Sequence, residues 1–272
     1  MKTLLLQLGN EERREVGFRV TSSLARRFGA HVVGYYPVPM QDFSGLAMGQ
    51  APMAVLDSIR AQALEEAKRH VARFDHACQI DGLLAEHRID EGEPVALLMA
   101  QSRIVDLAIV HQADPASFSP ADGEAVSTEL VLGAACPVLL IPYAGTFEQI
   151  GNRVLIAWND SREASRAVHD ALPMLKQAQK VVILTVNPPR DEAAAGAEVA
   201  AYLARHGVNA VASQTVIKDI DIASALVSAV SDYDADLLVM GAWGHSRMRE
   251  LMFGGATRGV LAQMTVPVLM SH

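Results

Sequence analysis

The chain repeats itself, and this repeat limits the folds open to it more than any other feature of the sequence. The segment Val105–Val110 matches Ala235–Met240, and Pro137–Leu139 matches Pro267–Leu269. Both matches have the same separation of 130 residues, from 105 to 235 and from 137 to 267. A repeat of this length predicts two copies of one domain within the chain.

The beginnings of the two halves align at a different separation. Thr3–Leu6 corresponds to Arg153–Ile156, 150 residues further along. The first half therefore carries about twenty extra residues, which we place between positions 40 and 78. We predict two domains, residues 1–143 and 152–272, because a chain of 272 residues gives each of them room for a core.

Both halves alternate short apolar runs with helical patterns. Runs of Val, Ile and Leu without alternation are typical of parallel strands that are buried on both faces. Helix starts are expected at Ser161 and Asp221, where a polar residue precedes an apolar stripe at helical spacing. The fold class expected is α/β, with two tandem doubly wound domains. The predicted strands are Thr3–Leu8, Ala30–Tyr36, Ala85–Ile89, Asp106–Val110, Val138–Ile141, Arg153–Trp158, Lys180–Val186, Val211–Val216, Leu237–Gly241 and Val266–Met270.

A strand of the second half leads into a glycine-spaced loop. The apolar run Leu237–Val239 is followed by Gly241, Gly244 and Gly254. Glycines let a backbone approach a ligand closely, and converging N–H groups then hold an anion such as a phosphate. A helix that begins near Gly254 to Thr257 would add its positive N-terminal end to the same site. The competing interpretation is a loop that needs glycine only to leave the strand.

This glycine spacing resembles the nucleotide motif of the universal stress protein family, and Val266–Met270 resembles the closing strand of that family. The resemblance covers nearly the whole chain as a tandem of two such domains. It implies five parallel strands in each sheet, in the order 3-2-1-4-5, with the last strand at the domain interface. It also implies ATP as the ligand, with or without Mg²⁺, and a domain pair that resembles a dimer and could assemble further.

Carried over residue by residue, the resemblance assigns one site in the second half. The adenine and ribose side consists of residues that follow the first two strands of that half: Ala157, Trp158, Asn159, Asp160 and Val186. The phosphate side consists of the strand end, the glycine loop and the next helix start: Met240, Gly241, Gly244, Gly254, Gly255, Ala256 and Thr257. His245 is a further candidate for a phosphate contact, from its place in the glycine loop.

Two residues depart from the pattern of the family. Gly255 stands where the family usually has Ser or Thr, so a side-chain contact with phosphate is lost unless Thr257 supplies it. Asn159 stands where the family commonly has Asp, and a shift of one residue would make Asp160 the equivalent. The alternative for Asp160 or Ser161 is a helix N-cap without a role in binding.

The matched positions of the first half lack the glycines. Gly241, Gly244 and Gly254 correspond to His111, Asp114 and Glu124, and Gly255 corresponds to Ala125. Carboxylates at the place of phosphates are unfavourable for binding, because like charges repel at short range. We therefore interpret residues 1–143 as a structural partner domain with a degenerate nucleotide loop; the alternative is that this half binds a different ligand.

Composition excludes several classes of protein. A net charge of −8 argues against a nucleic-acid partner, and no apolar run approaches the ~18 residues that a membrane helix needs. The cytoplasm is the expected location. The two cysteines lack CxxC spacing and are expected as free thiols. The three aspartates at 232, 234 and 236 are interpreted as solvated residues rather than as metal ligands. No catalytic motif is present in the sequence.

Three hypotheses for the function follow. The first is a stress-response protein whose second domain binds ATP and acts as a nucleotide-dependent regulatory module. The second is a nucleotide-free scaffold of the same fold that works through protein contacts. The third is a slow ATPase or autophosphorylating protein that uses a hydroxyl such as Ser246 or Thr257.

Overall fold

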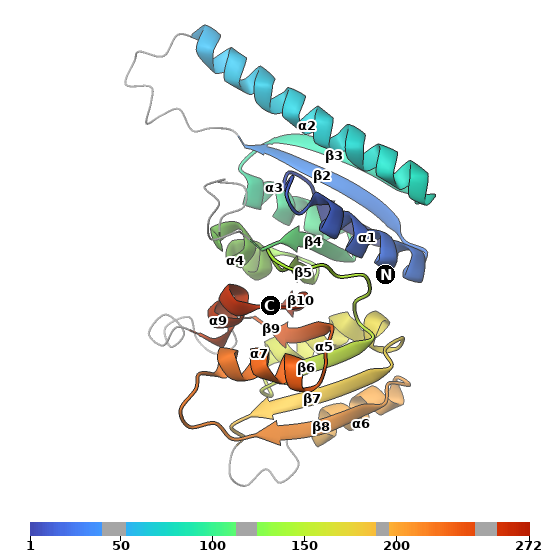
Figure 1. Cartoon of the computed structure of the whole chain (residues 1–272), viewed down its shortest axis with the longest axis vertical. Coiled ribbons are helices and arrows are strands. Elements are labelled where there is room, and N and C mark those ends of the chain that lie inside the picture. Colours follow the sequence, from blue (N-terminus) through green and yellow to red (C-terminus); the bar gives the residue numbers. More distant parts are fainter. Residues whose placement is uncertain (40–52, 113–123, 189–195, 243–254) are drawn as a thin grey trace.

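The structure is a computed structural model of the whole chain, and it describes residues 1–39, 53–112, 124–188, 196–242 and 255–272 (Figure 1). Ten strands form one sheet in the order β3-β2-β1-β4-β5-β10-β9-β6-β7-β8. Each half thus has the order 3-2-1-4-5, as predicted. The strands are β1 Thr3–Gln7, β2 His31–Pro39, β3 Ala85–Gly92, β4 Leu107–His111, β5 Val138–Ile141, β6 Arg153–Trp158, β7 Lys180–Val186, β8 Ala210–Thr215, β9 Leu237–Gly241 and β10 Val268–Ser271.

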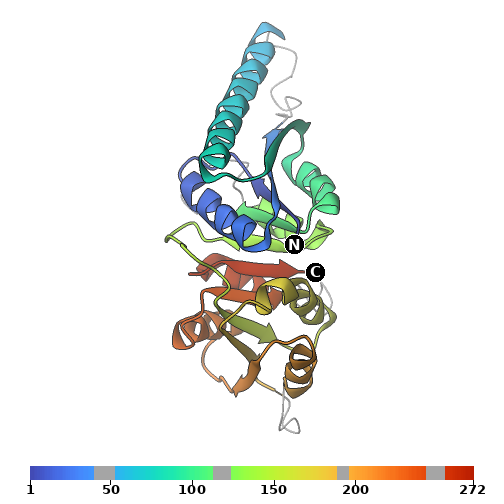
Figure 2. The ribbon, with the colours of Figure 1, turned by 90° about the vertical axis from the view of Figure 1, so that its right-hand side faces the viewer.

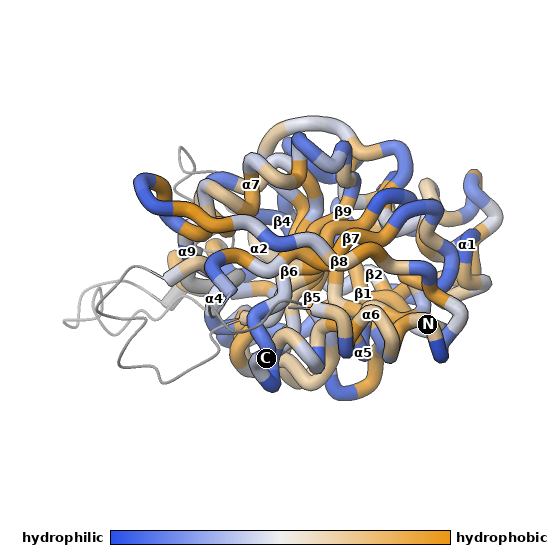
Figure 3. Tube along the Cα trace, turned by 90° about the horizontal axis from the view of Figure 1, so that it is seen from below, coloured by the Kyte–Doolittle hydropathy of each residue, from blue (hydrophilic) through white to orange (hydrophobic). Residues whose placement is uncertain are grey.

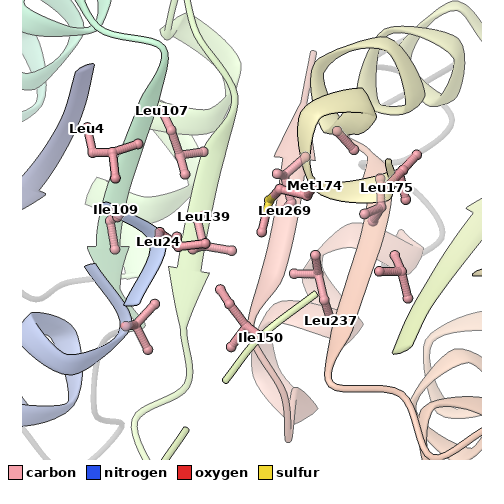
Figure 4. Close-up of a cluster of buried hydrophobic side chains, with 14 of the residues drawn as sticks. Leu4, Leu24, Leu107, Ile109, Leu139, Ile150, Met174, Leu175, Leu237 and Leu269 are labelled. Carbon is pink, nitrogen blue, oxygen red and sulfur yellow. The ribbon is translucent and has the colours of Figure 1, made fainter. Parts of the chain in front are cut away.

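The two halves meet through their last strands. β5 and β10 pair antiparallel, with Leu139 opposite Leu269, whereas the other strand pairs described are parallel. Both leucines are fully buried, and Figure 4 shows them side by side at the centre of the core. The two five-stranded sheets therefore continue into each other.

Helices cover both faces of the sheet. One face carries α1 Arg14–Phe28, α2 Met53–Asp81, α5 Arg162–Leu175 and α6 Ala197–Arg205. The other face carries α3 Pro94–Gln101, α4 Glu124–Gly133, α7 Ile222–Asp232 and α9 Ala256–Gln263, and the 3-10 turn η1 Ser102–Ile104 follows α3. Apolar strands run between these helices in Figure 3, as the Val, Ile and Leu runs predict.

Helix α2 contains the extra length of the first half. It has 29 residues, whereas α6, its counterpart in the second half, has 9. Figures 1 and 2 show α2 extending well beyond the edge of the sheet. None of the helices in the described part of the chain is long and apolar enough to cross a membrane. Cys78 and Cys136 are buried free thiols, as predicted.

The repeat also places one aspartate before each of two equivalent strands. Asp106 accepts hydrogen bonds from the backbone amides of Lys2 and Thr3 at the start of β1. Asp236 does the same for Gly151 and Asn152 before β6, at 2.7 and 3.0 Å. The interpretation of Asp236 as a solvated residue is therefore wrong, because its carboxylate satisfies amides that precede the strand.

Candidate functional site

A cavity of about 120 Å³ lies in the second half, where β6, β7 and β9 reach their carboxyl ends beneath α7 and α9. In open parallel sheets this edge is the usual place for a ligand, at the point where the strand order reverses. The residues that line it are Ala157, Trp158, Asn159, Leu184, Val186, Ile222, Leu226, Met240, Gly241, Ala256 and Thr257. Eight of these were predicted as site residues.

The sequence prediction missed the apolar wall of the cavity. Leu184 and Leu226 are buried, and Ile222 is 43% exposed at the start of α7. The signals for all three were present: Leu184 lies two residues before Val186 and so shares its face of β7, and Ile222 and Leu226 lie on the apolar stripe of one helix. In the sequence, such residues cannot be distinguished from core residues, because an apolar residue follows the same pattern whether it lines a cavity or packs in the core.

The loop after β6 is fixed by a helix cap. Ser161 is the N-cap of α5: its Oγ accepts a hydrogen bond from the amide of Ala164 at 3.1 Å and donates one to Asn159 Oδ1 at 2.7 Å. The N-cap alternative therefore holds for Ser161. Asp160 is exposed, has a left-handed φ of +57°, and is absent from the cavity lining. Asn159 remains at the rim and orients the cap.

Gly241 has a packing reason to be glycine. A Cβ at this position would lie 2.4 Å from both the backbone nitrogen of Ala164 and the carbonyl carbon of Glu163. The end of β9 thus passes directly against the first turn of α5. This contact requires glycine with or without a ligand, so Gly241 alone is not evidence for a phosphate site.

The phosphate side is only partly within the described residues. Gly255 is the N-cap of α9 and has no side chain with which to cap the first turn of this helix. Thr257 is buried and is the one residue with a hydroxyl among those described around the cavity. Trp243, Gly244, His245 and Gly254 lie outside the described residues.

Residues 151–272 match the model of the Universal stress protein family. These residues belong to the universal stress protein family. A curated relative, universal stress protein Slr1230 from Synechocystis sp., is 49% identical over 45 residues, and this match spans 16% of each chain.

Solved structures extend the universal stress protein likeness to the whole chain. A universal stress protein from Archaeoglobus fulgidus superposes with a TM-score of 0.78 at 16% identity, over 99% of this chain and 97% of that one. A protein of unknown function from Pseudomonas aeruginosa PAO1, PA1789, gives a TM-score of 0.60 at 15% identity, over 100% and 92% of the two chains. At these identities the similarity shows that the fold is shared.

In the first half of this universal stress protein fold, the position that matches Gly241 is occupied by a buried histidine. His111 is the last residue of β4, as Gly241 is of β9, and its ring packs against α1, where a Cβ on Gly17 would lie 2.4 Å from its Nε2. Burial, and then the charge of Arg13, lowers the pKa of His111 to about 4. His111 is therefore a core residue, neutral at pH 7, whose ring packs against Gly17 of α1. Asp114 lies outside the described residues.

Proposed function

We propose that the chain is a cytoplasmic stress-response protein whose second domain, residues 152–272, binds ATP. Occupancy of this site would control which surfaces the protein presents, so the domain would act as a nucleotide-dependent regulatory module. Residues 1–143 would serve as its structural partner domain through the β5–β10 pair. No catalytic step is required for this role.

The observation that carries the proposal is the composition of the cavity in the second half. It joins Trp158 after one strand, Val186 after the next and Thr257 at the start of α9, and these positions are far apart in the sequence. Apolar side chains with a few polar groups at the rim are typical of a small-molecule site. A flat, mostly apolar base fits this wall better than a charged ligand does.

Each part of ATP can be matched with the residues of the cavity whose chemistry suits it. The adenine would lie against Val186 and Leu226, and Asn159 at the rim would meet the ribose. The phosphates would lie toward the first amides of α9, because a helix N-terminus favours anions. Met240 and Ala256 would bound the same side. Gly244, His245 and Gly254 would complete the phosphate contacts, with Mg²⁺ bound to the phosphates when present.

The nucleotide-free scaffold is supported by a separate observation. Packing against Ala164 explains Gly241 without any ligand, and Gly255 removes the hydroxyl that the resemblance leads us to expect. The cavity bounded by described residues, about 120 Å³, is also smaller than the ~300 Å³ at which ligand pockets usually begin. A direct binding measurement separates the two functions.

The test is a calorimetric titration of ATP into the protein and two variants. Leu226→Trp fills the cavity and is expected to abolish binding. Val216→Trp adds the same ring at a position that is 71% exposed and is expected to bind ATP like the wild type. Absence of ATP binding to the wild type would reject the proposal in favour of the scaffold. Equal binding to the folded Leu226→Trp variant would place the ligand elsewhere.

A further inference from the structure

A second cavity, of about 300 Å³, lies in the first half between the sheet and the helices α1 and α2. It opens beside the turn that follows β1, and the last residue of β4, His111, lines its floor. This is not the counterpart of the candidate nucleotide site. That site lies on the face of α7 and α9, which corresponds to α3 and α4 in the first half.

The interior of this second cavity is apolar. Leu6 and Phe74 are buried and Phe18 is half-buried, and the rings of Phe18 and Phe74 meet edge to face with centroids 6.4 Å apart. The neutral imidazole of His111 adds no charge, although its buried Nε2 has no hydrogen-bond partner among the described residues. A hydrocarbon or aromatic body placed here would gain about 25 cal/mol for each Å² removed from water.

The mouth of the cavity has two guanidinium groups and the imidazole of His70 around one carboxylate, that of Glu11. Arg14 Nη1 lies 3.3 Å from Glu11 Oε1, and Arg73 contacts the same oxygen. His70 Nδ1 lies 3.5 Å from the other oxygen, Oε2. The Glu11 side chain is 50% exposed and sits in a turn, so it occupies the cluster from outside the cavity.

This arrangement identifies the group that the mouth recognises. Two guanidinium groups, with five donors each, share the single carboxylate of Glu11. Donors therefore remain for a second carboxylate, or for one that replaces Glu11. Glu15 is the acid among the residues that line the cavity, and it is exposed; Glu66 lies outside the lining, with its Oε1 3.9 Å from His70 Nε2. Burial lowers the pKa of His70, so the two arginines supply the positive charge at neutral pH.

We propose that this cavity binds a small amphipathic monocarboxylate, an alkyl or single-ring aryl acid. Its apolar body lies over Leu6, Phe18 and Phe74, and its carboxylate is held by Arg14 and Arg73. The site depends on the last third of α2, which supplies Arg73 and Phe74; aligned on Gly82 and Gly207, which follow the two helices, the corresponding residues of α6 are Glu198 and Val199, so the second half lacks this arginine and this ring. The proposal is independent of ATP binding.

The test is a calorimetric titration of the full-length protein with decanoate below its micellar concentration, beside decanol as a probe without charge. Arg73→Gln is expected to weaken decanoate binding by about tenfold and to leave decanol binding unchanged. Arg69→Gln is the matched control, because Arg69 is exposed on the same helix. Glu11→Gln is expected to strengthen decanoate binding, since it frees both guanidinium groups.

A blocking variant tests the location. Ala77→Trp fills the cavity and is expected to abolish binding of both probes, whereas Ala72→Trp, at an exposed position of α2, is expected to bind like the wild type. The proposal is overturned if the wild type does not bind decanoate, or if decanol binds as tightly as decanoate. It is also overturned if Ala77→Trp, with its fold verified by circular dichroism, or Arg73→Gln binds decanoate like the wild type.

Discussion

The side-chain amide of Gln112 donates a hydrogen bond of 2.6 Å to the backbone carbonyl of Leu261 and so connects the two halves of the chain. Gln112 is buried, and its Oε1 accepts a bond of 3.0 Å from the amide of Tyr143. The β5–β10 pair lies beside this contact, so the interface combines strand pairing with a satisfied polar bridge.

We expect Gln112→Leu to lower the free energy of unfolding by about 1–3 kcal/mol, because it leaves the carbonyl of Leu261 and the amide of Tyr143 without their partner. Urea denaturation followed by circular dichroism measures the loss. Gln214→Leu is the control, since Gln214 is exposed on β8 and its replacement is expected to change stability little. An unchanged midpoint for Gln112→Leu would mean that water satisfies both groups.

Gly241→Ala is expected to destabilise the protein by about 1–3 kcal/mol, because its Cβ would collide with the backbone of α5. A rotamer change cannot relieve the contact, since the nearest atoms belong to the backbone of Glu163 and Ala164. Thermal unfolding measures the effect. Wild-type stability in this variant would show that the end of β9 can move away from the helix.

Gly17→Ala is expected to behave differently, because its clash is with the ring of His111 rather than with backbone. The double variant Gly17→Ala with His111→Ala should recover part of the lost stability relative to the sum of the single variants. A double-mutant cycle from urea denaturation gives this coupling, which is about 0.5–3 kcal/mol for residues in contact. Strict additivity would contradict the packing described here.

The stability of the protein is expected to fall between pH 6.5 and about 4 because of His111. Its pKa is lowered to about 4 in the folded protein, so the unfolded chain binds the proton first as the pH decreases. Above pH 6.5 the free energy of unfolding carries no penalty from His111. Between pH 6.5 and about 4 it decreases by about 3 kcal/mol, because the buried imidazole resists protonation in the folded protein. Urea denaturation of the wild type and of His111→Gln at several pH values measures this effect. The variant is expected to lose less stability on acidification than the wild type.

Trp158 should report nucleotide binding, because its half-buried indole lines the candidate site. Addition of ATP is expected to change the intrinsic fluorescence saturably, and Trp158→Phe should remove most of the change. Trp243, which lies outside the described residues, is expected to contribute to the same signal. Trp243→Phe therefore serves as the companion variant. Calorimetric binding without any response from Trp158 would contradict the placement of the adenine.

The fold could be predicted almost completely from the sequence, because parallel strands buried on both faces leave uninterrupted Val, Ile and Leu runs. The predicted range Arg153–Trp158 is the observed β6, and Val138–Ile141 is β5. β3 was predicted three residues too short: it continues to Gly92 beside the long β2, and its polar edge residues Asp90 and Glu91 do not look like a strand.

The site could be predicted only in part. Residues at strand ends, such as Asn159 and Val186, follow from the topology of the sheet. Leu184 and Leu226 could not be distinguished from core residues, since the same apolar side chain serves both purposes. His111 was expected beside a lost phosphate cradle, and its actual partner, Gly17, is far away in the sequence and is matched only in three dimensions.

The antiparallel pairing of β5 with β10 has a consequence for assembly. A single five-stranded copy would leave its fifth strand open to another molecule, and its pairing would then depend on protein concentration. Here the second copy is attached to the same chain, so the effective concentration of the partner is fixed by a short linker. The pairing of β5 with β10 is therefore independent of protein concentration. The outer edges of the described sheet are β3 and β8.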